Sequence, residues 1–470
     1  MLQTIAYFPH PPIVLPEVGG ADSEKVSATY QAMKKLATAV ASAKPDYIVA
    51  ITPHGHIFSD AISITALGQL EGDLGRFGAP EVKVSFPLAG EAVQSIITGC
   101  QSKNFFCAAL DSDMLREYKL PLELDHGLVI PLYLIVQAGW QGSLVPINMA
   151  FLPFEELYDF GASLAKVLEN IGKNWALVIS GDLSHRLLPE APAGYSPQGA
   201  VFDEILRQAV REGDVKRIIH MDHVLIEDAG ECGLRPLIMG LGVLDGYEIK
   251  GEELSYEGPF GVGYLVARME KGARDSKREL VKDLYREREQ RLQDNRRTEA
   301  PLVNLARRSI ELYLNEARYL DNYHGTLGEQ EELLNSKAGA FVSLKKHEQL
   351  RGCIGTIEPT KENLAEEIIH NAVSAALNDP RFEPLEIEEL AQLSISVDVL
   401  GKPEKVASLT QLDPKTFGVI VSRGTRRGLL LPDLPGITSA EEQVNIAKQK
   451  AGISKEEEVV LERFRVTRYT

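Results

Sequence analysis

Residues 174–187 read NWALVISGDLSHRL, and this stretch decides the fold class of the first half of the chain. It begins with an asparagine, continues through five consecutive apolar residues and turns polar at Ser180. A short apolar run that ends in glycine and polar residues is typical of a buried strand. The run therefore predicts a core strand that delivers His185 into a loop. Ser180 and Asp182 are expected to fix that loop.

The rest of residues 1–270 alternates short apolar runs with amphipathic segments. Apolar residues at helical spacing predict helices, and short continuous apolar runs predict strands. Alternation of the two indicates an α/β domain with a mixed or parallel sheet. The predicted helices are 23–43, 126–139, 154–172 and 196–214, and the predicted strands are 46–56, 143–152, 175–181 and 261–269.

The segment 271–300 is dense in mixed charge and poor in apolar residues, which predicts a solvated helix that connects two domains. Residues 301–470 mix helices and strands without strict alternation, so we expect a smaller α+β domain there. Its predicted helices are 302–317, 361–379 and 439–452, and its predicted strands are 339–346, 393–401, 417–424, 427–433 and 462–469.

The composition narrows the class of protein. The chain has 470 residues, which suggests two or three domains, and its net charge of -17 disfavours partners such as nucleic acid or an anionic membrane surface. Its four cysteines lack C-x-x-C spacing, which argues against a disulfide framework or a zinc finger and fits a reducing compartment. Without a signal-like N-terminus or a long apolar stretch, we expect a cytoplasmic protein that does not span a membrane.

Four histidines of the first domain fall at predicted strand ends or at a helix start: His10, His54, His126 and His185. Ligands of open α/β sheets bind beyond the carboxyl ends of the strands. Side chains from separate segments can therefore converge at this edge. A single loop histidine is more often an ordinary surface residue, but four in such positions indicate a candidate metal site.

The stretches FPHPP, TPHGH, LDHGLVIPL and SGDLSH resemble, in this order, the motifs of class III extradiol catechol dioxygenases of the LigB type and of their MEMO-like relatives. The resemblance spans roughly residues 1–270. It implies a LigB-like mixed sheet flanked by helices, with a nonheme iron(II) centre held by two histidines and a carboxylate. Such a centre leaves positions open for a small aromatic diol, a catechol-like substrate, and for O2. A homo-oligomer is also implied.

Carried over from this resemblance, the metal ligands are His10 and His54, and the catalytic acid–base residues are His185 and His126. A catechol must lose a proton to chelate a metal, and a later step needs a proton donor. Histidine, with a pKa near neutrality, serves either role. Iron(II) is the expected cofactor, and zinc is the alternative.

The third metal ligand stays open. The resemblance implies a glutamate late in the domain, and Glu231 in EDAGECGLRPLI is preferred. The next residue, Cys232, matches the cysteine of MEMO-like proteins, and a thiolate would suit softer metals than iron(II). Glu227 and Asp228 are further options, and a site without a third protein ligand is also an alternative.

Three other histidines are expected outside the ligand set. His56 is expected to neighbour the site. His220 and His223 form an H-x-x-H pair, which is expected to lie on the surface.

The stretches LRGCIGTIEP, NAVSAALNDPRFEPL and RRGLLLPDL resemble the AMMECR-type domain, known as AmmeMemoRadiSam system protein A, over about residues 300–470. That family has no settled activity. Its naming links it to MEMO-like proteins and to radical S-adenosylmethionine enzymes, so a radical SAM protein is an expected partner.

Four residues of the second domain are candidates for a site. Cys353 is a candidate nucleophile whose thiolate Arg351 would favour, and Asp379 and Arg381 are expected to form a polar cluster near it. The alternatives are a buried cysteine in a strand and a turn that ends a helix.

Three functions remain as alternatives. The first is iron(II)-dependent ring cleavage of a catechol-like substrate. The second is a MEMO-like metal-binding or redox module that serves a protein- or cofactor-modification system, with Cys232 on the metal. The third is metal-dependent hydrolysis in which His185 acts as a base, which would favour zinc.

Overall fold

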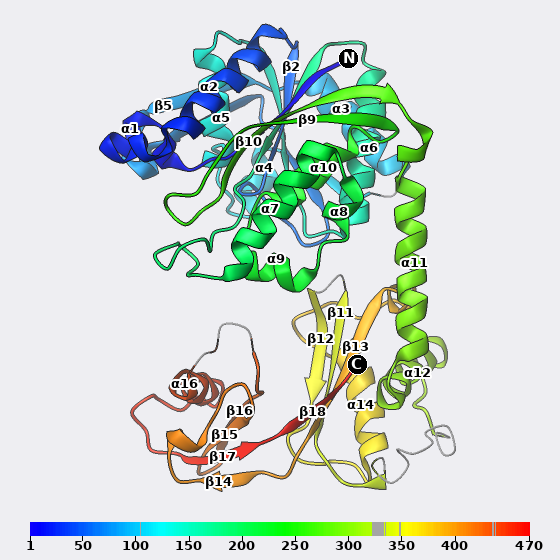
Figure 1. Ribbon diagram of the computed structural model, residues 1–470. Coiled ribbons are helices and arrows are strands. Elements are labelled where there is room, and N and C mark those ends of the chain that lie inside the picture. The colour runs from blue at the N-terminus through cyan, green and yellow to red at the C-terminus, as the bar shows by residue number, and fades with distance from the viewer. Residues whose placement is uncertain (104, 322–332, 334, 347–348, 435–436, 438) are drawn as a thin grey trace. The chain divides into compact units, whose positions relative to one another are not determined.

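The computed structural model describes residues 1–103, 105–321, 333, 335–346, 349–434, 437 and 439–470 (Figure 1). Contacts divide the chain into two compact units, Met1–Arg288 and Glu289–Thr470.

In the described part of the first unit, eight strands form one sheet in the order β6-β3-β7-β2-β8-β1-β10-β9. Its centre is parallel: β8 pairs with β1 on one side and with β2 on the other, and β2 pairs with β7. The strands β10 and β9 close one edge in antiparallel fashion. The strands are β1 Leu2–Phe8, β2 Tyr47–Thr52, β3 Ile62–Thr65, β6 Cys107–Leu110, β7 Ser143–Asn148, β8 Trp175–Ser180, β9 Tyr247–Glu257 and β10 Tyr264–Arg274.

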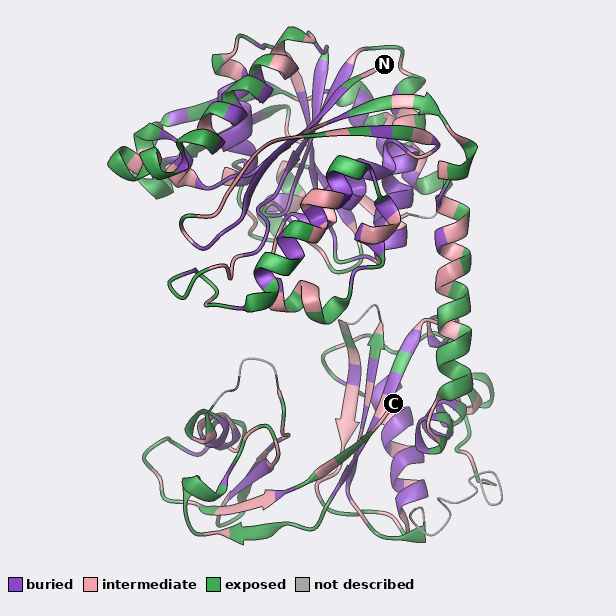
Figure 2. Ribbon diagram, in the orientation of Figure 1, coloured by how far each residue is buried: buried purple, intermediate pink, exposed green. Residues whose placement is uncertain are grey.

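Helices cover both faces of this sheet, so its central strands are buried throughout (Figures 1 and 2). One face packs against α2 (Ser27–Ser42) and α5 (His126–Gln137). The helices that pack against the other face include α3 (Gly90–Ser102), α6 (Phe154–Glu169), α7 (Pro197–Glu212) and α10 (Leu234–Gly242). The expected α/β fold with a mixed sheet is confirmed.

Smaller elements complete the first unit. The strands β4 (Gln69–Leu74) and β5 (Ala79–Pro87) form a separate hairpin. The unit also contains the short helices α1 Pro16–Gly19, α4 Ser112–Glu117, α8 Val215–Ile219 and α9 His223–Ala229. The sequence pattern predicts neither this hairpin nor β9, because their strands mix apolar and polar residues without a continuous apolar run.

The helix that connects the two units begins later in the chain than expected. Residues expected to open a charged helix instead extend β10 as far as Arg274, and the helix α11 runs from Val281 to Thr298. Strand β10 can continue into charged sequence because β9 pairs with it up to Arg274. The boundary between the two units falls within α11.

The second unit contains two four-stranded sheets in its described residues, β12-β11-β13-β18 and β14-β17-β15-β16. The expected α+β class is confirmed. The predicted strand 462–469 is two strands, one in each sheet. The elements are α12 Pro301–Glu316, β11 Ala340–Lys346, β12 Gln349–Gly355, α14 Leu364–Leu377, α15 Ile387–Leu390, β13 Leu393–Leu400, β14 Glu404–Val406, β15 Gly418–Arg423, β16 Arg426–Leu430, α16 Ala440–Lys450, β17 Val460–Phe464 and β18 Val466–Tyr469.

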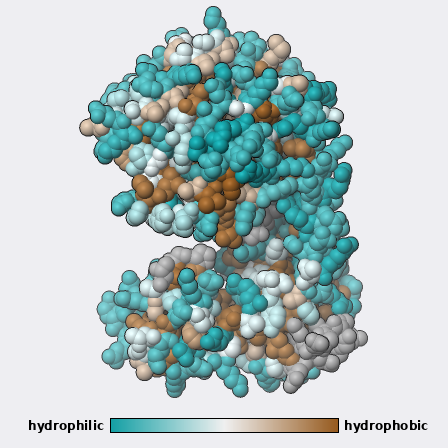
Figure 3. All heavy atoms as spheres, viewed as in Figure 1, coloured by the Kyte–Doolittle hydropathy of each residue, from teal (hydrophilic) through white to brown (hydrophobic). Residues whose placement is uncertain are grey.

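The described helices include none that is long and apolar enough to cross a membrane. The face in Figure 3 is mostly hydrophilic, with apolar side chains in separate patches.

Candidate metal centre

Three parallel strands bring the predicted histidines to one edge of the sheet. His10 follows the end of β1, His54 follows β2 and His185 follows β8. Strand β8 lies between the other two, so the three carboxyl ends are neighbours. His126 is the first residue of α5. The structure therefore gathers all four predicted histidines at the carboxyl edge, where ligands of open α/β sheets bind.

His10 is buried, and its hydrogen bonds fix its tautomer. The Ser180 hydroxyl lies 2.8 Å from Nδ1 of His10 and donates its single proton to the Gly127 carbonyl at 2.5 Å. Nδ1 of His10 must therefore donate to Ser180, which leaves a lone pair on Nε2. This is how a ligating histidine is usually held, with one nitrogen anchored and the other free to bind a metal.

Among the described residues, the potential ligand atoms of His10, His54 and Cys232 all lie within 4.8 Å of one another. Nε2 of His10 is 2.9 Å from Nε2 of His54 and 3.7 Å from Sγ of Cys232. Two imidazoles and a thiolate on one tetrahedral ion would give N–N and N–S separations of about 3.3 and 3.6 Å. The three side chains therefore fit a single cation after small adjustments.

The structure places Glu231 in a different role from the preferred one. One of its carboxylate oxygens accepts a hydrogen bond from Leu234 N at 2.6 Å, at the start of α10. The N-cap residue Gly233 has no side chain to satisfy that helix end, and Glu231 supplies the missing acceptor. The alternative ligand, Cys232, is the one that joins the two histidines.

The surroundings favour neutral groups in the absence of a cation. Burial, followed by the neighbouring histidines, lowers the pKa of His10 well below its ordinary value. The same two causes lower the pKa of His54 to about 4, and because this residue is exposed on one side, solvent weakens the effect of burial. Burial, followed by Asp182, raises the pKa of Cys232 well above its ordinary value. A bound cation would offset the negative charge of Asp182 and stabilise the thiolate of Cys232.

The two predicted acid–base histidines lie next to the candidate ligands. The ring of His126 stacks on that of His54, with centroids 4.8 Å apart. Nδ1 of His185 donates to the Gly230 carbonyl, so Nε2 carries the lone pair, and it lies 4.0 Å from Sγ of Cys232. Burial lowers the pKa of both His126 and His185, so both are neutral bases near pH 7.

Ser180 and Asp182 both bond to His10, and Asp182 thereby ties the beginning of the loop that carries His185 to the chain after β1. Asp182 accepts a hydrogen bond from His10 N at 2.9 Å, and Ser180 anchors the His10 ring. The loop of His185 is held by Ser184, whose hydroxyl donates to the Ala229 carbonyl at 2.9 Å. Burial raises the pKa of Asp182 to about 7.

A cavity of about 800 Å³ opens beside the three candidate ligands His10, His54 and Cys232, which together are called the metal group. His54 and His126 form part of its wall, and Phe77 lies 5.4 Å from His126, ring centroid to centroid. A cavity of this size accommodates a small organic molecule. Aromatic and charged residues share its lining, including His56, Phe58, Asp73, Arg76 and Glu123.

A hydrogen-bond relay that the sequence did not predict lies next to His54. Thr52 donates to a carboxylate oxygen of Asp125 at 2.7 Å and accepts from His54 N at 3.2 Å. Asp125 is the N-cap residue of α5 and directly precedes His126. The acidic residue at the helix start in LDHGLVIPL is the sequence feature that indicates such a capping role for Asp125.

The remaining candidates of the first unit lie outside the metal group. His56 is buried and lines the cavity, as expected for a neighbour. His220 pairs with Glu287 at 3.1 Å, while His223 stacks on Phe154, so the H-x-x-H pair is not joined at one site. Glu227 and Asp228, on α9, are not part of the metal group among the described residues.

Three of the second-unit candidates form a cluster, and the fourth does not. Cys353 N donates to Asp379 at 2.8 Å, and the Ser343 hydroxyl donates to Sγ of Cys353 at 3.2 Å. Arg381 bonds to Asp379 at 2.7 Å and to the Cys353 carbonyl at 3.2 Å, and its guanidinium lowers the pKa of Asp379. Arg351, expected beside the thiol, is paired with Glu389 instead.

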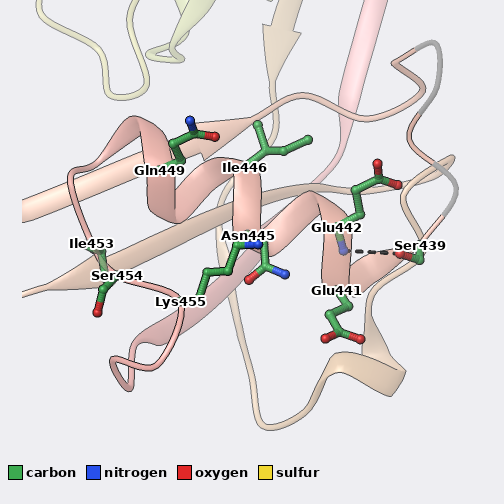
Figure 4. A pocket seen from close by; sticks show the side chains of 9 residues that line it. All are labelled: Ser439, Glu441, Glu442, Asn445, Ile446, Gln449, Ile453, Ser454 and Lys455. Atoms are coloured by element: carbon green, nitrogen blue, oxygen red, sulfur yellow. Dashed lines mark hydrogen bonds between the residues drawn. The ribbon is translucent and has the colours of Figure 1, made fainter.

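The second unit also has a groove of about 700 Å³ along α16 (Figure 4). Ser439 caps the helix by accepting a hydrogen bond from Glu442 N at 3.2 Å. Figure 4 shows polar side chains such as Asn445 and Gln449 around this groove. The cluster at Cys353 does not line it.

The comparisons with known proteins agree with this two-part organisation. A family model described as the catalytic LigB subunit of aromatic ring-opening dioxygenase matches residues 4–267, and the AMMECR1 model matches residues 303–470. A protein of Clostridium acetobutylicum is 40% identical over 461 residues, which cover 98% of this chain and 97% of that protein. A protein of Thermotoga maritima is 49% identical over 173 residues, which cover 36% of this chain and 98% of that relative.

Solved structures add two similar chains. An uncharacterized protein of Pyrococcus horikoshii is 32% identical, and the match covers 36% of this chain and 89% of that chain with a TM-score of 0.33. An uncharacterized protein of Escherichia coli K12 is 16% identical, and the match covers 57% of this chain and 99% of that chain with a TM-score of 0.39. On the family match over residues 4–267, this chain belongs to the family of the catalytic LigB subunit of aromatic ring-opening dioxygenases, and it carries an AMMECR1 unit after it.

Proposed function

We propose that the first unit is a metal-dependent redox centre whose ion is held by His10, His54 and Cys232. The observation that carries the proposal is the convergence of their three ligand atoms within 4.8 Å, with Glu231 occupied as a helix cap. The donor set fits a metal because the His10 tautomer presents a lone pair and the neutral imidazoles do not repel a cation.

A thiolate in the ligand set changes the expected metal. Two imidazoles and a thiolate suit zinc and copper more than a site with a carboxylate does, and iron(II) is correspondingly less favoured. Of zinc and copper, only copper is redox-active and fits the proposed redox centre. A bound redox-active ion would supply electron transfer to or from a substrate. The chain itself would position that substrate in the cavity beside His54 and move protons through His126 and His185.

Iron(II)-dependent extradiol cleavage of a catechol-like diol is the second candidate. Its support is the family match together with two further histidines at the edge of an open cavity. His126 is well placed to take a proton from a diol there, because burial keeps its imidazole neutral near pH 7. Cooperation with a radical SAM protein through the second unit stays a prediction, as do a homo-oligomer and a cytoplasmic location.

The two candidates are separated by metal analysis of the full-length protein and of two neighbouring variants. We expect Cys232→Ser to lose most of the metal found in the wild type by elemental mass spectrometry. Glu231→Gln is the matched control, because glutamine still offers an oxygen to Leu234 N. Metal loss in Glu231→Gln with retention in Cys232→Ser would contradict the proposed ligand set.

Oxygen uptake tests the chemistry. The proposed redox module with Cys232 as a ligand is expected to show no ring cleavage when iron(II)-loaded protein meets a panel of catechols under air. Oxygen consumption with a ring-opened product would instead establish the second candidate. In that case His126→Gln should reduce turnover by about 100-fold or more while the metal content stays unchanged.

A further inference from the structure

Tyr7 brings an unsatisfied polar group into the core beside the metal centre. It lies on β1, where it pairs in register with Ile179 of β8, and its side chain is fully buried. Its hydroxyl has no hydrogen-bond partner among the described residues. A buried hydroxyl without a partner loses its hydrogen bonds to water and forms none in the protein, which destabilises the fold. Such hydroxyls are therefore rare in native proteins, and each one calls for an explanation.

Two glycines make the space that the hydroxyl occupies. A Cβ atom on Gly233 would lie 2.0 Å from the Tyr7 hydroxyl oxygen, and one on Gly181 would lie 2.8 Å from it. Gly233 directly follows Cys232, and Gly181 directly precedes Asp182. The hydroxyl therefore lies against the two backbone segments that carry Cys232 and Asp182.

Those two segments are themselves bonded to each other. Asp182 N donates to Sγ of Cys232 at 3.3 Å, and Gly233 N donates to the Asp182 carbonyl at 2.9 Å. The sulfur thus already has one backbone donor. A thiol is a weak acceptor, whereas a metal-bound thiolate carries negative charge and accepts stronger, charge-assisted hydrogen bonds.

We propose that Tyr7 is a positioning residue whose hydroxyl donates a hydrogen bond to the Cys232 thiolate when that sulfur binds the metal. The proposal rests on the proposed function of the first unit. It explains why the strand carries a tyrosine at a buried position that phenylalanine would fill without an unsatisfied oxygen. The second donor would orient the sulfur and tune the metal–sulfur bond, as the groups around a ligand commonly do.

The test uses Tyr7→Phe in the full-length protein with cobalt(II) as the probe ion. Cobalt(II) bound to a thiolate gives a charge-transfer absorption that reports the metal–sulfur bond directly. We expect Tyr7→Phe to shift this band and to weaken cobalt affinity by about 10–100-fold, the usual effect of removing a group that supports a ligand. The matched control is Tyr47→Phe, which removes another buried hydroxyl without a partner among the described residues, on β2. It should behave as the wild type.

A second comparison separates a local effect from a general one. In a Cys232→Ser background the sulfur is gone, so Tyr7→Phe should change the residual affinity by less than about 2-fold if the hydroxyl acts through it. The melting temperature of the metal-free Tyr7→Phe protein should equal or exceed that of the wild type, because no bond is lost. A lower value would show that the hydroxyl already has a structural partner, which overturns the proposal.

The failure of this inference is distinguishable from the failure of the proposed function. If wild-type protein binds cobalt(II) with a thiolate band and Tyr7→Phe gives the same band and affinity, the role of Tyr7 is wrong and the metal centre stands. If the wild type gives no thiolate band, the ligand set itself is wrong, and the role of Tyr7 is overturned with it.

Discussion

Nε2 of His10 lies 2.9 Å from Nε2 of His54, although 44 positions separate the two residues in the chain. The strands before them, β1 and β2, flank β8 and end at the same edge of the sheet. Because Ser180 holds the His10 ring by Nδ1, its Nε2 lone pair faces His54. The sheet and one buried hydroxyl therefore set the positions of the two proposed ligands.

The buried hydroxyl of Ser180 gives the first prediction. In Ser180→Ala the His10 ring loses its acceptor, so its tautomer and orientation are no longer fixed. We expect metal affinity to fall by about 10–100-fold, measured by competition with a chromophoric chelator. The control is Ser309→Ala, which removes a buried hydroxyl bonded to the Leu305 carbonyl in the second unit. Unchanged affinity in Ser180→Ala would contradict the anchoring role.

Proton release on metal binding gives the second prediction. The pKa values of His10 and His54 are lowered, so both are neutral at pH 8, whereas the raised pKa of Cys232 keeps its thiol protonated. Asp182, with a pKa of about 7, has already lost most of its proton at that pH. Metal binding at pH 8 should therefore release about one proton, and affinity should rise about tenfold per pH unit below the thiol pKa.

Calorimetry in buffers with different heats of ionisation measures this proton. Cys232→Ser should release almost none, because serine keeps its hydroxyl proton under these conditions. Equal proton release from the wild type and Cys232→Ser would show that another group supplies it.

The sequence could predict which residues reach the site, because strand ends can be recognised from apolar runs. His54 and His185 both follow continuous runs that are buried in the structure. The family resemblance supplied the same positions. Parallel pairing of the strands then brings their ends together.

The sequence could not decide between Glu231 and Cys232. They are adjacent at the start of α10, and their directions depend on how that helix meets the sheet. Gly233 leaves the helix end without a side-chain cap, and the Glu231 carboxylate accepts the hydrogen bond from Leu234 N instead. The partners of Ser180 were also out of reach, since they depend on the order of strands in the sheet, which brings β1 beside β8.

The relay beneath His54 gives the third prediction. Thr52→Val keeps the side-chain shape but leaves Asp125 and His54 N without their partner. We expect the free energy of unfolding to fall by about 1–3 kcal/mol. Urea unfolding followed by tryptophan fluorescence measures it, because Trp140 and Trp175 both belong to the first unit.

Thr4→Val is the control for this relay. The buried Thr4 hydroxyl has no hydrogen-bond partner among the described residues, so its loss should leave stability unchanged or slightly higher. If Thr52→Val were as stable as Thr4→Val, the relay would have no energetic role.

The fourth prediction concerns the second unit at low pH. Glu389 lies 2.8 Å from Arg351 and 2.9 Å from Lys346. Burial raises its pKa, but the hydrogen bonds from these two cations outweigh burial and lower the pKa to about 2. Since the folded pKa lies below the unfolded value, the stabilisation is fully present above about pH 4.5 and is lost as pH falls towards 2.

Because Glu389 is partly solvated, we expect this contribution to be only about 1 kcal/mol. Glu389→Gln should lower stability at pH 6 and make little difference at pH 2.5, measured by urea unfolding with far-UV circular dichroism. The second unit has no tryptophan, so its unfolding is detected by circular dichroism and not by tryptophan fluorescence. Glu441→Gln, at an exposed position on α16, should keep the wild-type pH dependence. An equal loss from Glu389→Gln at both pH values would mean that shape, rather than charge, holds Arg351 in place.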